Sequence, residues 1–334
     1  MDEKLMSLSA GTSEESGNMR DQFDQREYTI RHLVVHAGVF HADDVFCGAL
    51  ARTLNPNVVI DRVISADGFA TDVDAGEVVA DIGMGLFDHH QPDCPVRDDG
   101  IKHCAASRLW LVYGISAVSK TCGKEVSNQE SGNLSEEMVD TIARSIYTGL
   151  LKTISAIDNG TEGFGKGIFT IADVVNGYRP SWIAEKTYEE GYFEAVELMQ
   201  NVLQNEIRAA LAREQARGYV ASCIDRMDRG TVVLEKYCPW KEQVIAEKRA
   251  MTIVYPSVRG GWNVEPVPYD LTELSYRVKV PEAWRGLRDT DAGNKMEGMT
   301  FCHAKGFLLA FDTKEHAINA AHWLNEHERL KQLR

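Results

Sequence analysis

Histidines and aspartates are concentrated directly after short apolar segments in the first third of the chain. The segments 31–36 and 77–82 have the length and the apolar character of strands buried in a parallel sheet. In open α/β sheets, side chains at the carboxyl ends of such strands meet at one edge and form binding sites. This pattern constrains the fold most, and it involves His36, His41 and Asp43, then Asp81, then Asp88, His89 and His90.

The rest of the chain alternates between helix and strand patterns. The segment 42–54 is predicted to be a helix that ends at Asn55-Pro56, and a strand over 58–64 follows it. Alternation of this kind favours an α/β fold with a parallel sheet and crossover helices. Further helices are predicted over 103–113, 135–158, 186–218 and 313–330, further strands over 231–234, 251–255 and 262–267, and a polar surface insertion over 119–134.

Length and composition favour two domains. A chain of 334 residues exceeds what one hydrophobic core usually serves, and its 44% hydrophobic residues are typical of a globular protein. The last third changes to short strands and a final helix, which indicates a smaller α+β domain. We predict a disordered tail over 1–28, a metal-binding domain over 29–185, a helical linker over 186–222, and a C-terminal α+β substrate domain over 223–334.

Composition also limits the partners and the location. No apolar run approaches the ~18–20 residues of a membrane span, so no membrane partner is expected. The net charge of −14 disfavours general binding to long duplex nucleic acid, whereas it is compatible with a short anionic substrate or a local basic groove. The seven cysteines are scattered without a C-x-x-C pair, which fits a reducing cytoplasm. An organellar or nuclear location stays open if the source is eukaryotic.

The clustered donors predict a metal site. Imidazole and carboxylate donors without a thiolate suit two divalent ions, of which Mn²⁺ is expected and Mg²⁺ or Zn²⁺ are alternatives. Two ions ~3.5–4 Å apart need a bridging carboxylate and roughly three further ligands each, which this set provides once Asp158 at the end of a predicted helix is included. Taken singly, each histidine has the alternative of a structural hydrogen bond, and each aspartate that of a turn residue. Asp44 is expected to cap the helix that follows it.

The string Phe87-Asp88-His89-His90-Gln91 resembles the motif that gives the DHH phosphoesterase superfamily its name. The early loop departs from the usual His-x-x-x-Asp-x-Asp of that superfamily. It reads His36-x-x-x-x-His41-x-Asp43, which resembles the MYG1 family, also catalogued as an uncharacterised metal-dependent protein hydrolase family. Similar strings stand at 158–160, 238–242, 281–289 and 303–307, so the resemblance covers roughly residues 32–330.

The resemblance implies a DHH-type parallel-sheet N-terminal domain and a smaller C-terminal domain, with the active site in the cleft between them. Asp81 would bridge the metals, His90 would contact the substrate, and Asp88 would orient a neighbouring histidine, so that His90 and Asp88 are the expected catalytic residues. Eukaryotic members are described as 3′-to-5′ exonucleases acting on RNA, and superfamily members often form homodimers. The implied metal ligands are His36, His41, Asp43, Asp81, His89 and Asp158.

Three residues of the C-terminal domain are candidates for substrate binding, namely Arg285, Arg288 and His303. Guanidinium groups match phosphate oxygens in pairs, although a surface ion pair with Glu282 or Asp289 is an alternative. The metal-ligand pattern predicts a metal-dependent phosphodiester hydrolase, and the resemblance implies that it is a 3′-to-5′ exonuclease acting on RNA or short oligonucleotides. The alternatives are a small-substrate phosphohydrolase, acting on a cyclic dinucleotide, a nucleotide or pyrophosphate, and a metal-binding regulatory protein with little catalysis.

Overall fold

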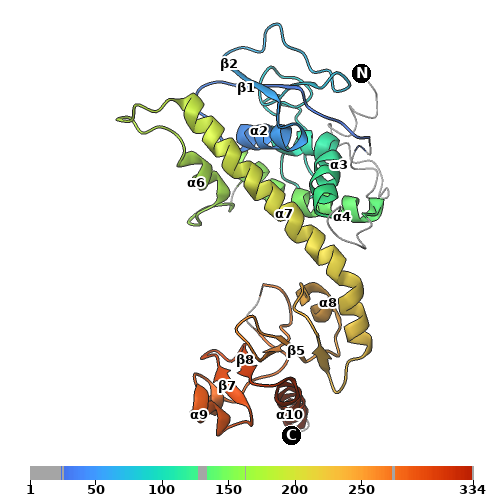
Figure 1. Cartoon of the computed structure of the whole chain (residues 1–334). Helices are drawn as coiled ribbons and strands as arrows, with labels where there is room; N and C mark the ends of the chain where they lie inside the picture. Colours follow the sequence, from blue (N-terminus) through green and yellow to red (C-terminus); the bar gives the residue numbers. More distant parts are fainter. Residues whose placement is uncertain (1–23, 25, 127–133, 162, 273–274, 333–334) are drawn as a thin grey trace. The chain divides into compact units, whose positions relative to one another are not determined.

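The computed structural model describes residues 24, 26–126, 134–161, 163–272 and 275–332. They form two compact units that divide between Leu211 and Ala212 (Figure 1). The first unit contains β1 (His32–His36), α2 (Ala42–Leu54), β2 (Val59–Val63), β3 (Glu77–Val79), α3 (Ala105–Val126), α4 (Glu136–Thr148), α5 (Leu150–Asp158), α6 (Ile171–Asn176) and most of α7 (Tyr188–Asp225). The second unit contains β4 (Thr231–Val233), α8 (Lys241–Ala246), β5 (Thr252–Pro256), β6 (Trp262–Pro266), η2 (Glu282–Trp284), α9 (Asp289–Gly293), β7 (Met299–Cys302), β8 (Leu309–Phe311) and α10 (Lys314–Gln332).

The first unit is built on a parallel sheet with the strand order β2-β1-β3. The predicted α/β class with parallel strands is thereby confirmed. β1 is central, and its Leu33, Val34 and Val35 are buried, which explains the uninterrupted apolar run in the sequence. Just after β3, Ala80 donates its backbone N–H to the carbonyl of Val34 at 2.9 Å. This pairing brings the residue that follows Ala80 to the edge of the sheet where β1 ends at His36.

The helices of the first unit share one hydrophobic core, in which α3 packs against α2, α4 and α5. α2 has the predicted bounds. α3 continues to residue 126, so the first half of the predicted insertion 119–134 is helical, while residues 127–133 lie outside the described residues. Thr121 and Cys122 are buried there. This part of the predicted surface insertion is therefore a helix with a packed face, although its composition is polar. The predicted helix 135–158 is interrupted at Gly149, where α4 ends and α5 begins.

The second unit contains a mixed sheet with the strand order β4-β5-β6-β8-β7. β4 and β5 are parallel, and the other neighbours are antiparallel. α10 packs against this sheet, with Ala317, Ala320 and Leu324 in the shared core. The strands predicted over 231–234, 251–255 and 262–267 are confirmed as β4, β5 and β6. The sequence analysis does not predict β7 and β8, which have 4 and 3 residues.

Two predictions concern the ends of the first unit. Of the predicted disordered tail 1–28, residues 1–23 and 25 lie outside the described residues. The described end of that segment packs on α3, because Asp24 donates its backbone N–H to Leu111 at 2.9 Å and Tyr28 donates its own to Ser116 Oγ at 2.8 Å. At the other end, α7 runs through the predicted linker 186–222 as one helix. Among the helices of the described chain, none is both long and apolar enough for a bilayer crossing.

Candidate metal centre

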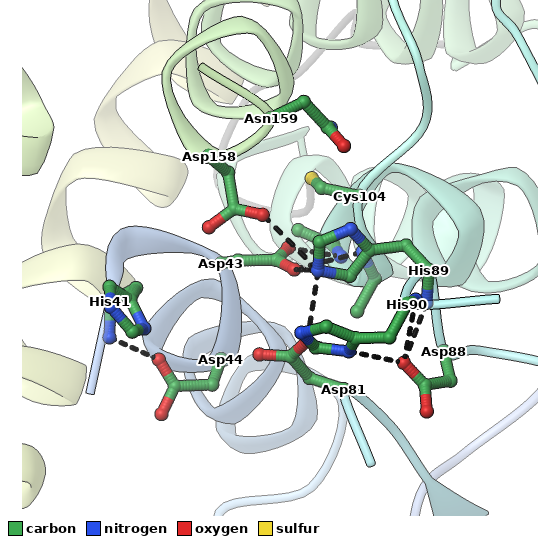
Figure 2. A network of polar contacts seen from close by, with 12 residues as sticks. His41, Asp43, Asp44, Asp81, Asp88, His89, His90, Cys104, Asp158 and Asn159 are labelled. Carbon is green, nitrogen blue, oxygen red and sulfur yellow. Dashed lines mark hydrogen bonds and ion pairs between the residues drawn. The ribbon is translucent and has the colours of Figure 1, made fainter. Parts of the chain in front are cut away.

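The six predicted metal ligands come together at the carboxyl edge of the β2-β1-β3 sheet. They come from the end of β1, the start of α2, the segment 81–90 and the end of α5. Figure 2 labels all of them except His36. In each of three groups, of which the second and third share His89, the donor atoms lie within 4.8 Å of one another. The groups are His36, His41 and Asp44, then Asp81, His89 and His90, and then Asp43, His89 and Asp158.

Asp81 connects these groups. Its carboxylate is buried, with 4% exposed, and its two oxygens face different histidines. Asp81 Oδ2 lies 3.3 Å from His36 Nε2, and Oδ1 lies 3.1 Å from His89 Nε2. The backbone of Asp81 has a φ of 58°, in the left-handed region that few residues other than glycine adopt, although aspartate tolerates it. Conformations of this kind persist where the surrounding structure requires them, which is common at functional sites.

His89 is the donor that two groups share. Its Nε2 atom lies 3.2 Å from Asp158 Oδ2 and 3.5 Å from Asp43 Oδ2. Asp43 is fully buried and accepts backbone hydrogen bonds from Ala105 at 2.9 Å and Ala106 at 2.6 Å, at the start of α3. These bonds fix the Asp43 carboxylate, while Asp158 reaches the same imidazole from the last residue of α5.

Asp44 belongs to the site, although the sequence predicts only a capping role for it. Its Oδ1 atom accepts the backbone N–H of His41 at 2.6 Å, so the predicted capping of α2 is confirmed. Its Oδ2 atom lies 3.5 Å from His36 Nε2. Successive side chains of a helix point about 100° apart, so the doublet Asp43-Asp44 sends one carboxylate to each of two groups. The doublet is the sequence signal from which Asp44 could have been recognised as a further candidate ligand.

Negative charge is concentrated in the site and is balanced by imidazoles. Burial raises the pKa of Asp43, Asp44 and Asp158 to about 7, and neighbouring carboxylates act in the same direction. Burial alone would also raise the pKa of Asp81, but the imidazoles of His36 and His89 lower it to about 2. Contact with Asp81 raises the pKa of His36 to about 9. Burial disfavours the charged form of His89, yet the surrounding carboxylates raise its pKa to about 9.

Asp88 orients His90. The Asp88 carboxylate accepts backbone hydrogen bonds from Met84, His89 and His90 at 2.6, 2.7 and 3.1 Å, and its Oδ1 lies 2.7 Å from His90 Nδ1. Burial would raise the pKa of Asp88, but these hydrogen bonds lower it. The His90 side chain is 57% exposed. Because Asp88 engages Nδ1, Nε2 is the ring nitrogen that remains for a ligand.

The three groups open into one cavity of about 870 Å³. Its wall includes the apolar side chains of Ile154 and Ile157, and it also includes Lys102. Among the described residues, no carboxylate lies within ion-pair distance of Lys102. The Asn159 amide donates to the backbone carbonyls of Lys102 at 3.1 Å and His103 at 3.2 Å, which holds this irregular segment beside α5. The sequence contains no pattern that singles out Lys102.

This donor set fits divalent ions. Asp44 Oδ2 and Asp81 Oδ1 are buried and accept no hydrogen bond. Buried polar atoms are nearly always satisfied, so these two oxygens, which lie in different groups and have only ion-pair contacts with imidazoles, are available to bind cations. Nitrogen and oxygen donors without a thiolate suit Mn²⁺, Mg²⁺ or Zn²⁺. Asp81 directs one oxygen toward His36 and the other toward His89.

Comparison with known families places most of the chain in one family. Residues 32–323 match the MYG1 family model, which is described as an uncharacterised protein family (UPF0160). The chain belongs to the MYG1 family. It is 27% identical over 325 residues to the MYG1 exonuclease of Mus musculus, which covers 86% of this chain and 82% of that protein. No solved structure matches the chain.

Other relatives span most of this MYG1-family chain as well. It is 24% identical over 323 residues to the MYG1 protein of Saccharomyces cerevisiae, which covers 85% of this chain and 93% of that protein. It is also 24% identical over 326 residues to the MYG1 exonuclease of Homo sapiens, with 86% and 83% covered. Similarity therefore extends over both units.

The three candidate substrate residues lie in the second unit and are engaged by their own surroundings. Arg285 donates to the carbonyl of residue 280 through Nε at 3.2 Å and Nη2 at 3.0 Å. The Arg288 guanidinium lies 5.0 Å from the ring centroid of Phe301. The imidazole of His303 packs on Phe307, with ring centroids 3.9 Å apart. Their role toward a substrate stays a prediction.

Proposed function

We propose that this MYG1-family protein is a metal-dependent hydrolase that shortens RNA or short oligonucleotides from the 3′ end. The observation that carries the proposal is the pair of contacts made by Asp81, because one carboxylate joins two histidine-containing groups that line one cavity. The relatives from Mus musculus and Homo sapiens that are named exonucleases support this reaction class. The proposal includes a DHH-type arrangement of domains and two metal ions. It also adds Asp44 to the six predicted ligands.

The side chains of the cavity suit attack on a phosphodiester. Divalent ions held by these ligands would lower the pKa of water and neutralise the charge of phosphate oxygens. His90 Nε2 would donate a hydrogen bond to a nonbridging oxygen or a proton to the leaving oxygen, and Asp88 would keep the ring in the required orientation. Lys102, on the cavity wall, would bind a further phosphate oxygen through its ammonium group.

Charge bears on the size of the substrate. A net charge of −14 repels long polyanions, so it favours a short strand or a chain end. The same observation favours a second candidate function, the hydrolysis of a small substrate such as a cyclic dinucleotide, a nucleotide or pyrophosphate.

All seven cysteines are free thiols, which supports a reducing compartment such as the cytoplasm.

Hydrolysis of end-labelled RNA tests the proposal. A short single-stranded RNA, labelled at the 5′ end or at the 3′ end, is incubated with Mn²⁺ or with a chelator, beside a dinucleotide and pyrophosphate. Stepwise loss of 3′ nucleotides that requires Mn²⁺ is expected. Activity only on the dinucleotide or on pyrophosphate would support the second candidate, and metal-independent activity would refute both.

A matched pair of variants links the activity to the site. Asp81→Asn should abolish the reaction because it removes the shared carboxylate charge. Asp61→Asn is the control, since Asp61 also contacts a histidine, His32 at 3.0 Å, but lies outside the cavity on β2. Equal loss in both variants would show that the effect is not specific to the metal centre.

A further inference from the structure

A second pocket, of about 430 Å³, lies on the second unit and is lined mainly by cations. We call it the basic pocket. It stands out because the whole chain has a net charge of −14. Like charges repel, so a group of cations at one concave surface favours the binding of an anion. The side chains that line the basic pocket are those of Lys248, Arg249, Met251, Tyr269, Arg277 and Arg329.

A buried guanidinium holds the pocket in shape. Arg277 is 8% exposed, and its Nη1 atom donates to the backbone carbonyls of residues 247 and 250 at 2.6 and 2.7 Å. These carbonyls belong to the turn between α8 and β5, which carries Lys248 and Arg249. Arg277 therefore fixes the turn as well as adding its own charge. The arrangement of cations depends on an anchored backbone and not on exposed side chains alone.

The cations of the basic pocket are only partly compensated. Arg249 forms a two-pronged pair with Glu247, in which both nitrogen–oxygen distances are 2.9 Å. Lys248 and Arg329 are both exposed, and in the described part of the chain neither has a carboxylate within ion-pair distance. Arg329 comes from α10, so two separate elements present the uncompensated charge.

We propose that the basic pocket binds the phosphodiester backbone of single-stranded RNA. Lysine and arginine side chains from two elements can contact successive phosphates, which is the usual basis of backbone recognition. Tyr269 lines the same pocket and is 56% exposed, so its ring is available for stacking against an unpaired base. A single strand offers phosphates and unpaired bases together. The choice of RNA rests on the proposed function, whereas the phosphate chemistry follows from the pocket itself.

A binding experiment without metal separates this proposal from catalysis. The full chain is titrated into a fluorescently labelled single-stranded RNA in a chelating buffer, and anisotropy is recorded at several salt concentrations. The double variant Lys248→Ala/Arg329→Ala should bind about 10-fold more weakly, and the slope of log affinity against log salt should fall by about 1.4, since each phosphate contact in a single strand contributes about 0.7. Lys248→Arg/Arg329→Lys should retain the affinity, because it keeps both charges.

The matched control is Arg259→Ala/Lys295→Ala, which removes the same charge from exposed positions of the second unit outside the pocket. It should leave affinity and salt slope close to wild type. Equal weakening in both alanine variants, no change in either, or no RNA binding by the wild type would overturn the proposal. Displacement of the RNA by an equal concentration of adenosine monophosphate would also overturn it, because the pocket would then take a single phosphate. Failure of RNA hydrolysis with metal would count against the proposed function and leave this binding result unaffected.

Discussion

Replacing Asp44 by asparagine separates the proposed metal-binding role of this residue from its structural role. Asparagine has nearly the same shape, and its Oδ1 atom can still accept the backbone N–H of His41 that caps α2. The substitution removes the charge on the oxygen that lies 3.5 Å from His36 and accepts no hydrogen bond. The metal-free protein and the metal-bound protein should therefore respond in opposite directions.

In the metal-free protein, the burial of Asp44 determines how much Asp44→Asn changes the stability. The pKa of Asp44 rises from 3.8 to about 7 in the folded protein. The folded state thus binds this proton more tightly than the unfolded state, so Asp44 costs stability increasingly as the pH rises from about 4 to about 7. At about 1.36 kcal/mol for each pH unit, the cost reaches at most about 4 kcal/mol near pH 8. Asp44→Asn should raise the metal-free Tm by up to about 10 °C.

Differential scanning fluorimetry near neutral and alkaline pH, with Mn²⁺ or chelator, measures both effects. Wild type should gain about 2.7 kcal/mol when Mn²⁺ is present at about 100 times its Kd, and Asp44→Asn should lose most of this gain. The control is Asp173→Asn, because Asp173 holds the same capping-box position on α6 but is exposed. A metal-free Asp44→Asn protein no more stable than wild type, with an undiminished Mn²⁺ response, would refute the assignment.

Three further changes test other parts of the account. Lys102→Ala should lower kcat/KM at least about tenfold with unchanged metal binding, and kinetics equal to wild type would contradict a phosphate contact. Burial lowers the pKa of His103 to about 3, so this residue costs stability as the pH falls below about 6.5. Wild type should therefore lose free energy of unfolding between about pH 6.5 and 5 because of His103, and His103→Gln should reduce this loss by up to about 2 kcal/mol. Urea unfolding at the two pH values measures the difference. Gly48→Ala should lower the free energy of unfolding by about 1–3 kcal/mol without altering the metal response. The reason is that the Cβ of the new alanine would lie 2.7 Å from Tyr192 and 2.8 Å from Val196. Unchanged stability would refute this packing.

Elements with strong local patterns could be predicted from the sequence. The apolar run Leu33–Val35 predicts a buried parallel strand, and Asn55-Pro56 marks the end of α2. Other elements depend on tertiary contacts that no local pattern records. Thr121 and Cys122 continue α3 because they are buried, although the surrounding composition is polar. Gly149 interrupts a hydrophobic periodicity that would by itself predict one long helix.

The candidate site also combines features that the sequence predicts with features that only tertiary contacts determine. Clustering of His36, Asp81 and His89 could be predicted, because each follows a strand or a short apolar run. The separate destinations of Asp43 and Asp44 could not, since they depend on how α2 lies against α3 and β1. Lys102 is visible only in the structure, because Asn159 holds an irregular segment against the cavity.

Metal stoichiometry tests the central claim most directly. The full chain is dialysed to equilibrium against Mn²⁺, and bound manganese is measured by elemental analysis for wild type, Asp81→Asn and the control Asp61→Asn. We expect about two ions per chain in wild type and in the control. In Asp81→Asn, which would remain folded by circular dichroism, we expect no more than about one. No bound manganese in wild type, or the same amount in all three proteins, would contradict a metal centre bridged by Asp81.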